Sequence, residues 1–379
     1  MKPLSGIKVL ELARILAGPW AGQVLADLGA EVIKVERHVE GDDTRGWGPP
    51  FVHDTDGSVW GAAYFHATNR GKSSVCLDMA TPEGQDAIKR LVSDADVVIE
   101  NFKVGGLKKY GLDYDALKAV NPRLVYVSIT GFGQDGPYAH RAGYDYIIQG
   151  MSGLMDITGE PHREPQKVGV AVVDLFTGVY ASTAILAALR QRDMTGEGSH
   201  IDMALMDCAV AMLANQAMNY LTSGISPSRL GNAHPNIAPY QVFQVKDGHV
   251  IVAVGNDHQF RRFCQVLEAD YVAENTAYQT NAGRVAARVQ LEAALTPFMM
   301  MHTRAELLAK LEAAGVPAGP INRIGDVFND PQVIHRGMKL ELGAVSGVAS
   351  PIVINGERMV ADGPSPKLGQ GKSDWETLT

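Results

Sequence analysis

The chain has 379 residues, of which 46% are hydrophobic and 20% are charged, and its formal net charge at pH 7 is −8. These proportions are ordinary for a soluble globular protein and exclude a low-complexity or disordered chain. The length allows one large domain with a smaller one, or two comparable domains. Because the chain is acidic and has no local block of lysine and arginine, nucleic acid is not expected as a partner.

Signals of secretion, membrane insertion and metal binding are not found in the sequence. Residues 1–12 lack the basic segment and the sustained apolar segment of a signal peptide, and we find no run of about 18 apolar residues. Cys76, Cys208 and Cys264 are far apart, odd in number and without zinc-type spacing. We therefore expect a cytoplasmic protein with no metal site and no membrane partner.

The N-terminal part of the chain alternates between strand-like and helix-like segments. Ile7–Leu12 reads as a buried strand, Gly18–Leu28 as a helix and Glu31–Glu36 as a second strand, which together form a βαβ unit. Three further elements continue this alternation: a helix over Pro82–Ser93 with Thr81 as its N-cap, and strands over Asp96–Glu100 and Leu124–Ile129. The alternation predicts an open, mostly parallel sheet flanked by helices, as in Rossmann-like domains.

The second half of the chain begins with apolar helices and then changes character. The expected elements are a helix over Gly178–Arg192, a strand over His200–Leu205, a Met- and Ala-rich helix to about Leu221, a hairpin of Tyr240–Val245 with His249–Val254, and helices near Asp257–Leu267, Val285–Met301 and Arg304–Ala314. We expect residues 1–200 with 330–379 to form the large domain and 225–325 a smaller α+β domain. Residues 200–225 and 325–330 would then link them.

One carboxylate stands out because of its position. The apolar run from Val168 delivers Asp174 immediately before a helix rich in Ala, Leu and Ile. An acid at the start of a helix usually caps it or interacts with its dipole, so on spacing alone Asp174 has a structural interpretation. Its sequence context favours a catalytic interpretation instead.

That context is a series of sequence blocks spread over nearly the whole chain. The blocks are Leu16–Ala21, Gly29–Arg37, Gly41–Arg45, Asn69–Ser73, Glu100–Phe102, Gly131–Pro137, Arg192–Asp202, Gly231–Tyr240, Ala314–Pro320 and Asp362–Gly369. In this order and at this spacing, they resemble the family III CoA-transferases, the group of formyl-CoA:oxalate CoA-transferase, carnitine CoA-transferase and α-methylacyl-CoA racemase. The resemblance implies a large Rossmann-like open-sheet domain, a smaller α+β domain and an interlocked homodimer.

The resemblance also implies a mechanism, because the nucleophilic aspartate of the family falls on Asp174. A carboxylate is ionised at neutral pH and attacks a thioester to give a mixed anhydride, from which an aspartyl-CoA thioester then forms. Acyl-CoA and a small carboxylic acid would be the substrates. This route requires no metal and no tightly bound cofactor.

The family's CoA contacts fall on a set of residues near the ends of the predicted strands, where open α/β sheets bind nucleotides. They are Leu16, Ala17, Arg37, Leu77, Asp78, Met79, Asn101, Phe102, Lys103, Lys109, Arg141 and Tyr144. The chain departs from the formyl-CoA branch at Ala80 and Ala142, which replace lysines, and Gly255–His258 stands where that branch has a Gly-rich loop. These departures weaken the case for oxalate. We expect a small aliphatic acid as acceptor and succinyl-CoA as donor, with Trp47, Arg163 and His234 as candidates for the acyl pocket.

Two other functions remain open at this point. Racemases of the same superfamily abstract an α-proton with a His/Asp pair, and here Tyr144 stands at the position of that histidine. A tyrosine with its ordinary pKa of about 10 is a poor base at neutral pH, which favours the transferase. The third interpretation is a non-catalytic protein that binds acyl-CoA or a nucleotide, and Asp174 argues against it.

Overall fold

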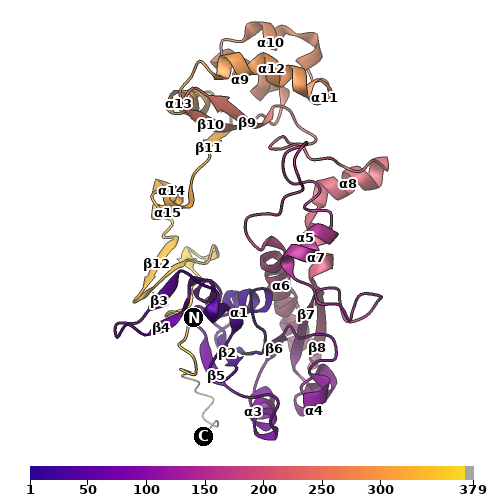
Figure 1. Ribbon diagram of the computed structural model, residues 1–379, viewed down its shortest axis with the longest axis vertical. Helices are drawn as coiled ribbons and strands as arrows, with labels where there is room; N and C mark the ends of the chain where they lie inside the picture. The colour runs from indigo at the N-terminus through magenta and orange to yellow at the C-terminus, as the bar shows by residue number, and fades with distance from the viewer. Residues whose placement is uncertain (372–379) are drawn as a thin grey trace. The chain divides into compact units, whose positions relative to one another are not determined.

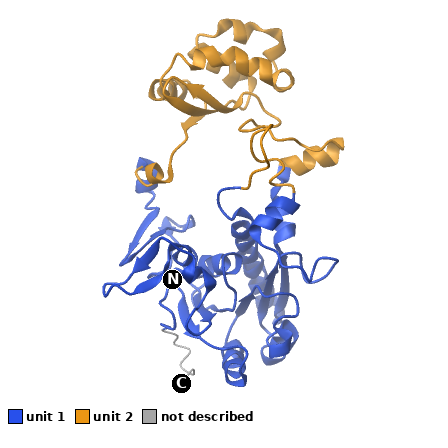
Figure 2. Ribbon diagram, in the orientation of Figure 1, with its two compact units in different colours: residues 1–152, 168–214, 330–379 blue, residues 153–167, 215–329 orange. Residues whose placement is uncertain are grey.

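The computed structural model describes residues 1–371 and divides the chain into two compact units (Figure 2). Unit 1 comprises residues 1–152 and 168–214 together with the chain from 330 onward, and unit 2 comprises residues 153–167 and 215–329. The boundaries at 214/215 and 329/330 fall within the two segments predicted to be linkers. Residues 153–167 differ from the predicted division, since the Arg229 guanidinium is 3.0 Å from an Asp156 carboxylate oxygen and Gly231 N donates to Gly159 O.

Unit 1 is built on a six-stranded sheet in which every pair of neighbouring strands is parallel (Figure 1). Its strands are β1 (Lys8–Glu11), β2 (Glu31–Glu36), β5 (Ser73–Cys76), β6 (Val97–Glu100), β7 (Val125–Thr130) and β8 (Ser199–Ala204). The order in space is β5-β2-β1-β6-β7-β8, so the direction of winding reverses between β1 and β6. Ligands of open α/β sheets bind at such a reversal, beyond the carboxyl ends of the strands. The predicted Rossmann-like fold is confirmed.

Helices cover this sheet. They are α1 (Ala17–Asp27), α3 (Pro82–Ser93), α4 (Tyr114–Val120), α5 (Asp145–Met151), α6 (Val172–Thr195) and α7 (Leu205–Met212). The Thr81 hydroxyl accepts a hydrogen bond from Gly84 N, as predicted for the start of α3. Helix α6 begins at Val172, six residues before the predicted start, because Val172 and Val173, the last two residues of the apolar run, already have helical geometry. Asp174 therefore lies within the first turn of the helix rather than before it.

Helix α6 is also unusually apolar. Within residues 1–371 it is the one helix long and apolar enough to cross a membrane by length and composition, with a mean hydropathy of 1.7 over its most apolar stretch. This corrects the expectation that no segment reaches that threshold. Core helices pass the same test, and the buried face of α6, which includes Val173, Ala181 and Ile185, belongs to a helix packed on α1 (Figure 1).

Unit 1 also contains short elements that carry little periodicity and were not predicted. They are η1 (Asp43–Gly46), β3 (Phe51–His53), β4 (Val59–Ala62), α2 (Ala63–His66), η2 (Lys108–Tyr110), α15 (Pro331–His335), β12 (Lys339–Leu342), β13 (Val345–Val348), β14 (Val353–Ile354) and β15 (Glu357–Arg358). Strands β3 and β4 form a hairpin, as do β12 with β13 and β14 with β15. Strands this short leave too few residues to show an alternating pattern.

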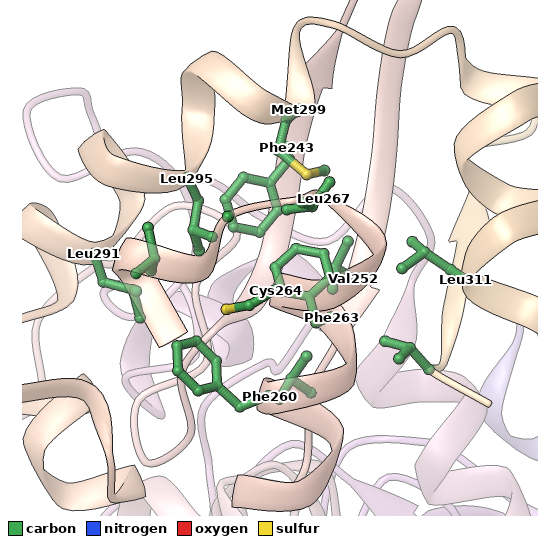
Figure 3. Packing of buried hydrophobic residues seen from close by; sticks show 14 of the residues in the cluster. Phe243, Val252, Phe260, Phe263, Cys264, Leu267, Leu291, Leu295, Met299 and Leu311 are labelled. Atoms are coloured by element: carbon green, nitrogen blue, oxygen red, sulfur yellow. The ribbon is translucent and has the colours of Figure 1, made fainter. Parts of the chain in front are cut away.

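Unit 2 is an α+β unit with its own core (Figure 3). The predicted hairpin is present as β9 (Tyr240–Val245) and β10 (Gly248–Ala253), and β11 (Ala318–Pro320) pairs with β10. Its helices are α8 (Ala214–Ser223), α9 (Asp257–Val266), α10 (Asp270–Glu274), η3 (Thr276–Tyr278), α11 (Asn281–Ala286), α12 (Arg288–Met299), α13 (Arg304–Ala313) and α14 (Ile324–Val327). Phe243, Phe263 and Leu295 are completely or almost completely buried among them. The predicted helix over Val285–Met301 is two helices, since the backbone leaves helical geometry at Ala287.

Candidate active site

Two neighbouring cavities of unit 1 share part of their walls, and the larger of them lies where the winding of the sheet reverses. It has a volume of about 820 Å³, and its walls include the segments that follow β1 and β6 together with the end of β7. The segment 141–144 reaches this edge because Gly131 and Gly143 allow their backbones to meet. A Cβ on Gly143 would lie 2.3 Å from the Gly131 Cα atom, which no side chain tolerates. The sheet therefore places the loops that follow β1, β6 and β7 around this cavity.

Asp174 lines this cavity from the first turn of α6. The N-cap residue is Ala171, which has no side-chain acceptor, so the helix start is not capped by Asp174. In the described part of the chain, the half-buried Asp174 carboxylate has no hydrogen-bond partner of its own. Gly178, one turn later, allows the close approach of α1, since a Cβ there would lie 2.7 Å from Ala17 O. The structure therefore favours a free carboxylate at this position rather than a capping one.

The surroundings of Asp174 change its acidity. Burial, and secondarily the neighbouring Asp145 carboxylate, raise the pKa of Asp174 from the ordinary 3.8 to about 7. Strong shifts of this kind concentrate at functional sites. A carboxylate that binds protons more tightly is also the better nucleophile once it is ionised.

The raised pKa predicts a pH dependence of the first chemical step. If Asp174 is the nucleophile that the family resemblance implies, only its ionised form attacks, so the rate at which the donor acid is released from acyl-CoA in a single turnover should rise with pH through a midpoint near the Asp174 pKa of about 7. The released donor acid would be measured after rapid quenching from about pH 5 to about pH 9. A rate that does not change between about pH 5 and about pH 8 would contradict the assignment.

Basic side chains surround the same cavity. Arg14, Lys103, Lys109 and Arg141 all contribute to its walls. Arg14 forms an ion pair of 2.7 Å with Asp43, and the Arg141 guanidinium lies 4.6 Å from the centre of the Tyr138 ring. Cations at this position can offset the charge of phosphates or carboxylates.

The smaller cavity, of about 280 Å³, lies beside β2 and shares Arg14, Phe102 and Tyr110 with the larger one. Arg37 and Leu77 contribute to its walls. The Arg37 guanidinium is 2.9 Å from the same Asp43 carboxylate that binds Arg14. Asp43 therefore fixes one cation of each cavity, and the three shared residues form a continuous wall between them.

The loop between β1 and α1 has a strained backbone at the larger cavity. Ile15 has a φ of 73°, which is rare for a β-branched residue and costs about 1–3 kcal/mol. Asp42 accepts a hydrogen bond from Ile15 N, and the Asn101 side chain bonds both Arg14 N and Arg14 O. These side chains hold the loop that presents Leu16 and Ala17 to the cavity.

A buried ionic network lies beneath this loop. The Lys34 ammonium is 3.1 Å from Glu11 and 2.8 Å from Asp42, and all three side chains are fully enclosed. The Lys72 ammonium is 2.7 Å from the same Glu11 carboxylate. Because Asp42 also accepts from Ile15 N, the network connects the core of the sheet to the wall of the cavity.

The structure places the predicted nucleophile and all of the predicted CoA-contact residues in the walls of the two cavities. The larger cavity is lined by Leu16, Ala17, Asn101, Phe102, Lys103, Lys109, Arg141, Tyr144 and Asp174, and the smaller by Arg37, Leu77, Asp78, Met79 and again Phe102. Trp47 lines the larger cavity, whereas Arg163 and His234 belong to unit 2. Ala80 and Ala142 line the two cavities, so the expected loss of two positive charges falls within the site. In the Gly255–His258 segment, Asn256 caps α9.

Sequence reasoning missed four residues of this region. Arg14, Asp43 and Tyr110 line the cavities, and Asp145 lies at the start of α5 beside Asp174. Arg14 closely follows β1. Because ligands of open α/β sheets bind beyond the carboxyl ends of the strands, this position could have identified Arg14 as a candidate site residue. The sequence offers no comparable signal for Asp145, because its closeness to Asp174 depends on the packing of α5 against α6.

The fold and the site define an α/β protein with cavities at the carboxyl edge of its parallel sheet and, in the wall of the larger cavity, a carboxylate whose pKa is raised. The model of CoA-transferase family III matches residues 4–372. The succinate–glutarate CoA-transferase of Agrobacterium fabrum is 57% identical over 373 residues, which are 97% of this chain and 93% of that protein. The succinyl-CoA:glutarate CoA-transferase of Mus musculus is 42% identical over 375 residues, 98% of this chain and 85% of that one. A crystal structure of a CAIB/BAIF family protein from Brucella suis has a TM-score of 0.88, 58% identity and 97% coverage of both chains.

The chain belongs to CoA-transferase family III and is an enzyme of that family. The expected family is therefore confirmed. Both curated relatives are named CoA-transferases, which favours the transferase over the racemase. Tyr144 also favours the transferase. It lines the larger cavity, and its side chain is a poor base compared with the histidine that racemases have at this position.

Proposed function

We propose that this enzyme transfers CoA between succinate and a second small dicarboxylate, with Asp174 as the covalent nucleophile. The observation that carries the mechanism is an unengaged carboxylate with a pKa raised to about 7, placed in the wall of the larger cavity. The substrate class rests on the relatives, which are named for succinate or succinyl-CoA and for glutarate.

The mechanism balances without an added acid, base or cofactor. An Asp174 oxygen attacks the thioester carbonyl, the C–S bond breaks, and CoA leaves as a thiolate beside an acyl-aspartyl anhydride. The thiolate then attacks Cγ of Asp174 and releases the donor acid, which leaves an aspartyl-CoA thioester. The acceptor carboxylate attacks the same carbon, and the thiolate finally attacks the acceptor's carbonyl in the new anhydride. That last step frees the Asp174 carboxylate.

The two cavities suit the two ends of CoA. Arg14 and Arg37 line the smaller cavity and would bind the phosphates of CoA. The apolar side chains of Leu77, Met79 and Phe102 in the same cavity would contact the nucleobase. The thioester end would then enter the larger cavity, whose walls include Asp174. Arg141 would be available to a carboxylate of the acid substrate.

A substrate panel tests the proposed function. Purified enzyme would be incubated with succinyl-CoA and, separately, glutarate, oxalate, acetate or benzoate, and the new thioesters would be identified by mass spectrometry. Glutaryl-CoA should form fastest, because relatives at 57% and 42% identity are named for glutarate. Turnover of aryl or long-chain acyl-CoA alone would overturn the proposed substrate class. No new thioester with any acid would overturn the proposed transfer.

We also propose that the enzyme has no tightly bound cofactor and no metal. Within residues 1–371, no group of three or more His, Cys, Asp or Glu side chains has metal-binding geometry, and the anhydride route needs no Lewis acid. Activity should therefore survive dialysis against EDTA. Loss of turnover that is restored by Zn²⁺ or Mg²⁺ would contradict this.

The enzyme is further proposed to be a homodimer. Phe176, Val179, Tyr180 and Leu186 form an exposed apolar face on α6, and such a face on a soluble protein usually contacts a partner. We expect a second copy of the chain to contact this face, as the family resemblance implies. Light scattering should give twice the chain mass of 40.7 kDa at micromolar concentration, and a monomer would overturn the proposal.

We propose that the enzyme is cytoplasmic. Cys76, Cys208 and Cys264 are all free, which suits a reducing compartment. Cell fractionation with antibodies against the chain would test it, and enrichment in a membrane or secreted fraction would overturn it.

A further inference from the structure

The start of α6 is capped by a residue from another helix. The Oδ1 atom of Asp145, in the first turn of α5, accepts hydrogen bonds from Val173 N at 2.8 Å and from Asp174 N at 3.3 Å. The N-cap residue Ala171 has no side chain that could do this. Asp145 therefore satisfies backbone N–H groups that a helix otherwise leaves to its own N-cap residue.

Asp145 is itself held firmly. Its second oxygen, Oδ2, accepts a hydrogen bond of 2.7 Å from the side-chain amide of Gln149, which is fully buried one turn later in α5. The Gln149 oxygen in turn accepts from Val168 N at 2.9 Å, in the segment that leads into α6. Both oxygens of Asp145 are thus engaged, so its carboxylate has a fixed orientation next to Asp174.

This arrangement has two consequences for Asp174. Its carboxylate is not needed to cap its own helix and stays available to a substrate in the cavity. A second negative charge also lies near it, which disfavours ionisation and makes the ionised form more basic. The half-buried Tyr64 responds to the same two charges, since burial, then Asp174 and then Asp145 raise its pKa.

We propose that Asp145 is a positioning residue for the transfer reaction: it caps α6 in place of Asp174 and, through its charge, strengthens Asp174 as a nucleophile. This inference rests on the proposed function of Asp174. It goes beyond that function because it assigns separate tasks to two neighbouring carboxylates. Asp145 is engaged by hydrogen bonds with the start of α6 and with Gln149, and Asp174 is free to react.

Other charged groups face the same space and must be separated from Asp145 in any test. They are Arg14, Asp43, Lys103, Lys109 and Arg141 in the cavity wall, together with Tyr64 in α2, whose pKa is affected by Asp174. Helix α1 has no acidic side chain in its first turn and no basic side chain in its last turn. Asp145 is the one whose charge acts on Asp174.

Two variants separate the effect of the Asp145 charge from the effect of its hydrogen bonds to the start of α6. Asp145→Asn keeps an oxygen that can accept from Val173 N but removes the charge, whereas Asp145→Ala removes both. In Asp145→Asn the midpoint of the pH–rate profile should fall by about one pH unit, and the plateau rate at high pH should fall by about 3- to 10-fold. In Asp145→Ala the single-turnover rate should fall by about 100-fold with a nearly unchanged KM, because the nucleophile is misplaced. Asp145→Glu should recover part of that loss.

Asp330→Asn is the matched control. Asp330 also accepts hydrogen bonds from backbone N–H groups at a helix start, at α15, but it does not line either cavity. This variant should keep the wild-type midpoint and rate. A melting temperature measured for every variant identifies any that fails to fold, and Asp145→Asn then carries the test alone.

The outcomes distinguish this inference from the proposed function. If Asp145→Asn is folded and keeps the wild-type midpoint and plateau rate, Asp145 has no role in positioning or charge and the inference is wrong. If Asp174→Ala retains activity, the proposed nucleophile is wrong whatever Asp145 does. A lowered midpoint in Asp145→Asn together with loss of the Asp174 adduct in Asp174→Ala supports both.

Discussion

Asp174→Ala is expected to abolish CoA transfer and to leave the fold and the affinity for acyl-CoA close to those of the wild type. The nucleophile's removal eliminates the covalent route, so the turnover number should fall by at least about 10³-fold. The fold should tolerate the change because Asp145, not Asp174, caps α6. Loss of a charge in the first turn of a helix costs only about 0.3–1 kcal/mol.

The covalent intermediate gives this prediction a second measurement. Wild-type enzyme mixed with acyl-CoA should form an adduct that hydroxylamine or borohydride traps and that peptide mass locates on Asp174. The variant should form none. Glu83→Ala serves as the matched control, since Glu83 is an acid in the first turn of α3 and lines neither cavity. A folded Asp174→Ala enzyme that keeps more than about a tenth of the wild-type rate would show that Asp174 has only a structural role.

The sequence predicts five of the six strands of the large sheet because they contain short apolar runs. Strand β5 was not predicted, since Ser73–Cys76 is short and begins with two serines. Thr81 with Pro82 marks the start of α3 correctly, since capping is a local interaction between residues three apart. The start of α6 was misplaced because an apolar run before Asp174 suits a strand and a buried helix equally well. Ala287 separates two helices through a backbone conformation that an apolar pattern does not reveal.

The site could be predicted only as far as the family resemblance and the strand-end rule allow. Arg37 and Asn101 follow strands β2 and β6, so their place at the edge of the sheet is a consequence of topology. The link that Asp43 makes between Arg14 and Arg37 depends on how the segments after β1 and β2 approach each other, and no spacing encodes it. The same holds for Asp145, which approaches Asp174 across 29 residues of chain.

The buried network around Lys34 should matter most for stability. Burial alone would lower the pKa of Lys34, but the charges of Asp42, Glu11 and Glu36 raise it above its ordinary value, so Lys34 stays charged. Likewise burial would raise the pKa of Asp42, yet Lys34 and the hydrogen bonds of Thr44 lower it to about 2. Each charge is therefore stable inside the protein only because its partner is present.

Lys34→Met should lower the free energy of unfolding by about 3–5 kcal/mol at pH 7, because it leaves the Glu11 and Asp42 carboxylates buried without this cation. Denaturation in urea would measure the loss. Lys339→Met is the control, since the exposed pair of Lys339 with Glu341 should contribute no more than about 1 kcal/mol.

The pH dependence of that loss tests its electrostatic origin. In the wild type, the lowered pKa of Asp42 gives stability that is fully present above the ordinary value of 3.8 and is lost as pH falls toward about 2. Without Lys34, burial should raise the pKa of Asp42 above 3.8, so the folded variant binds a proton that the unfolded chain releases. Raising the pH above that value then destabilises the variant, and the difference from wild type should grow between about pH 4 and about pH 7. A difference that is constant over this range, or smaller than about 1 kcal/mol at pH 7, would show that the lost packing of the Lys34 side chain, and not its charge, accounts for the effect.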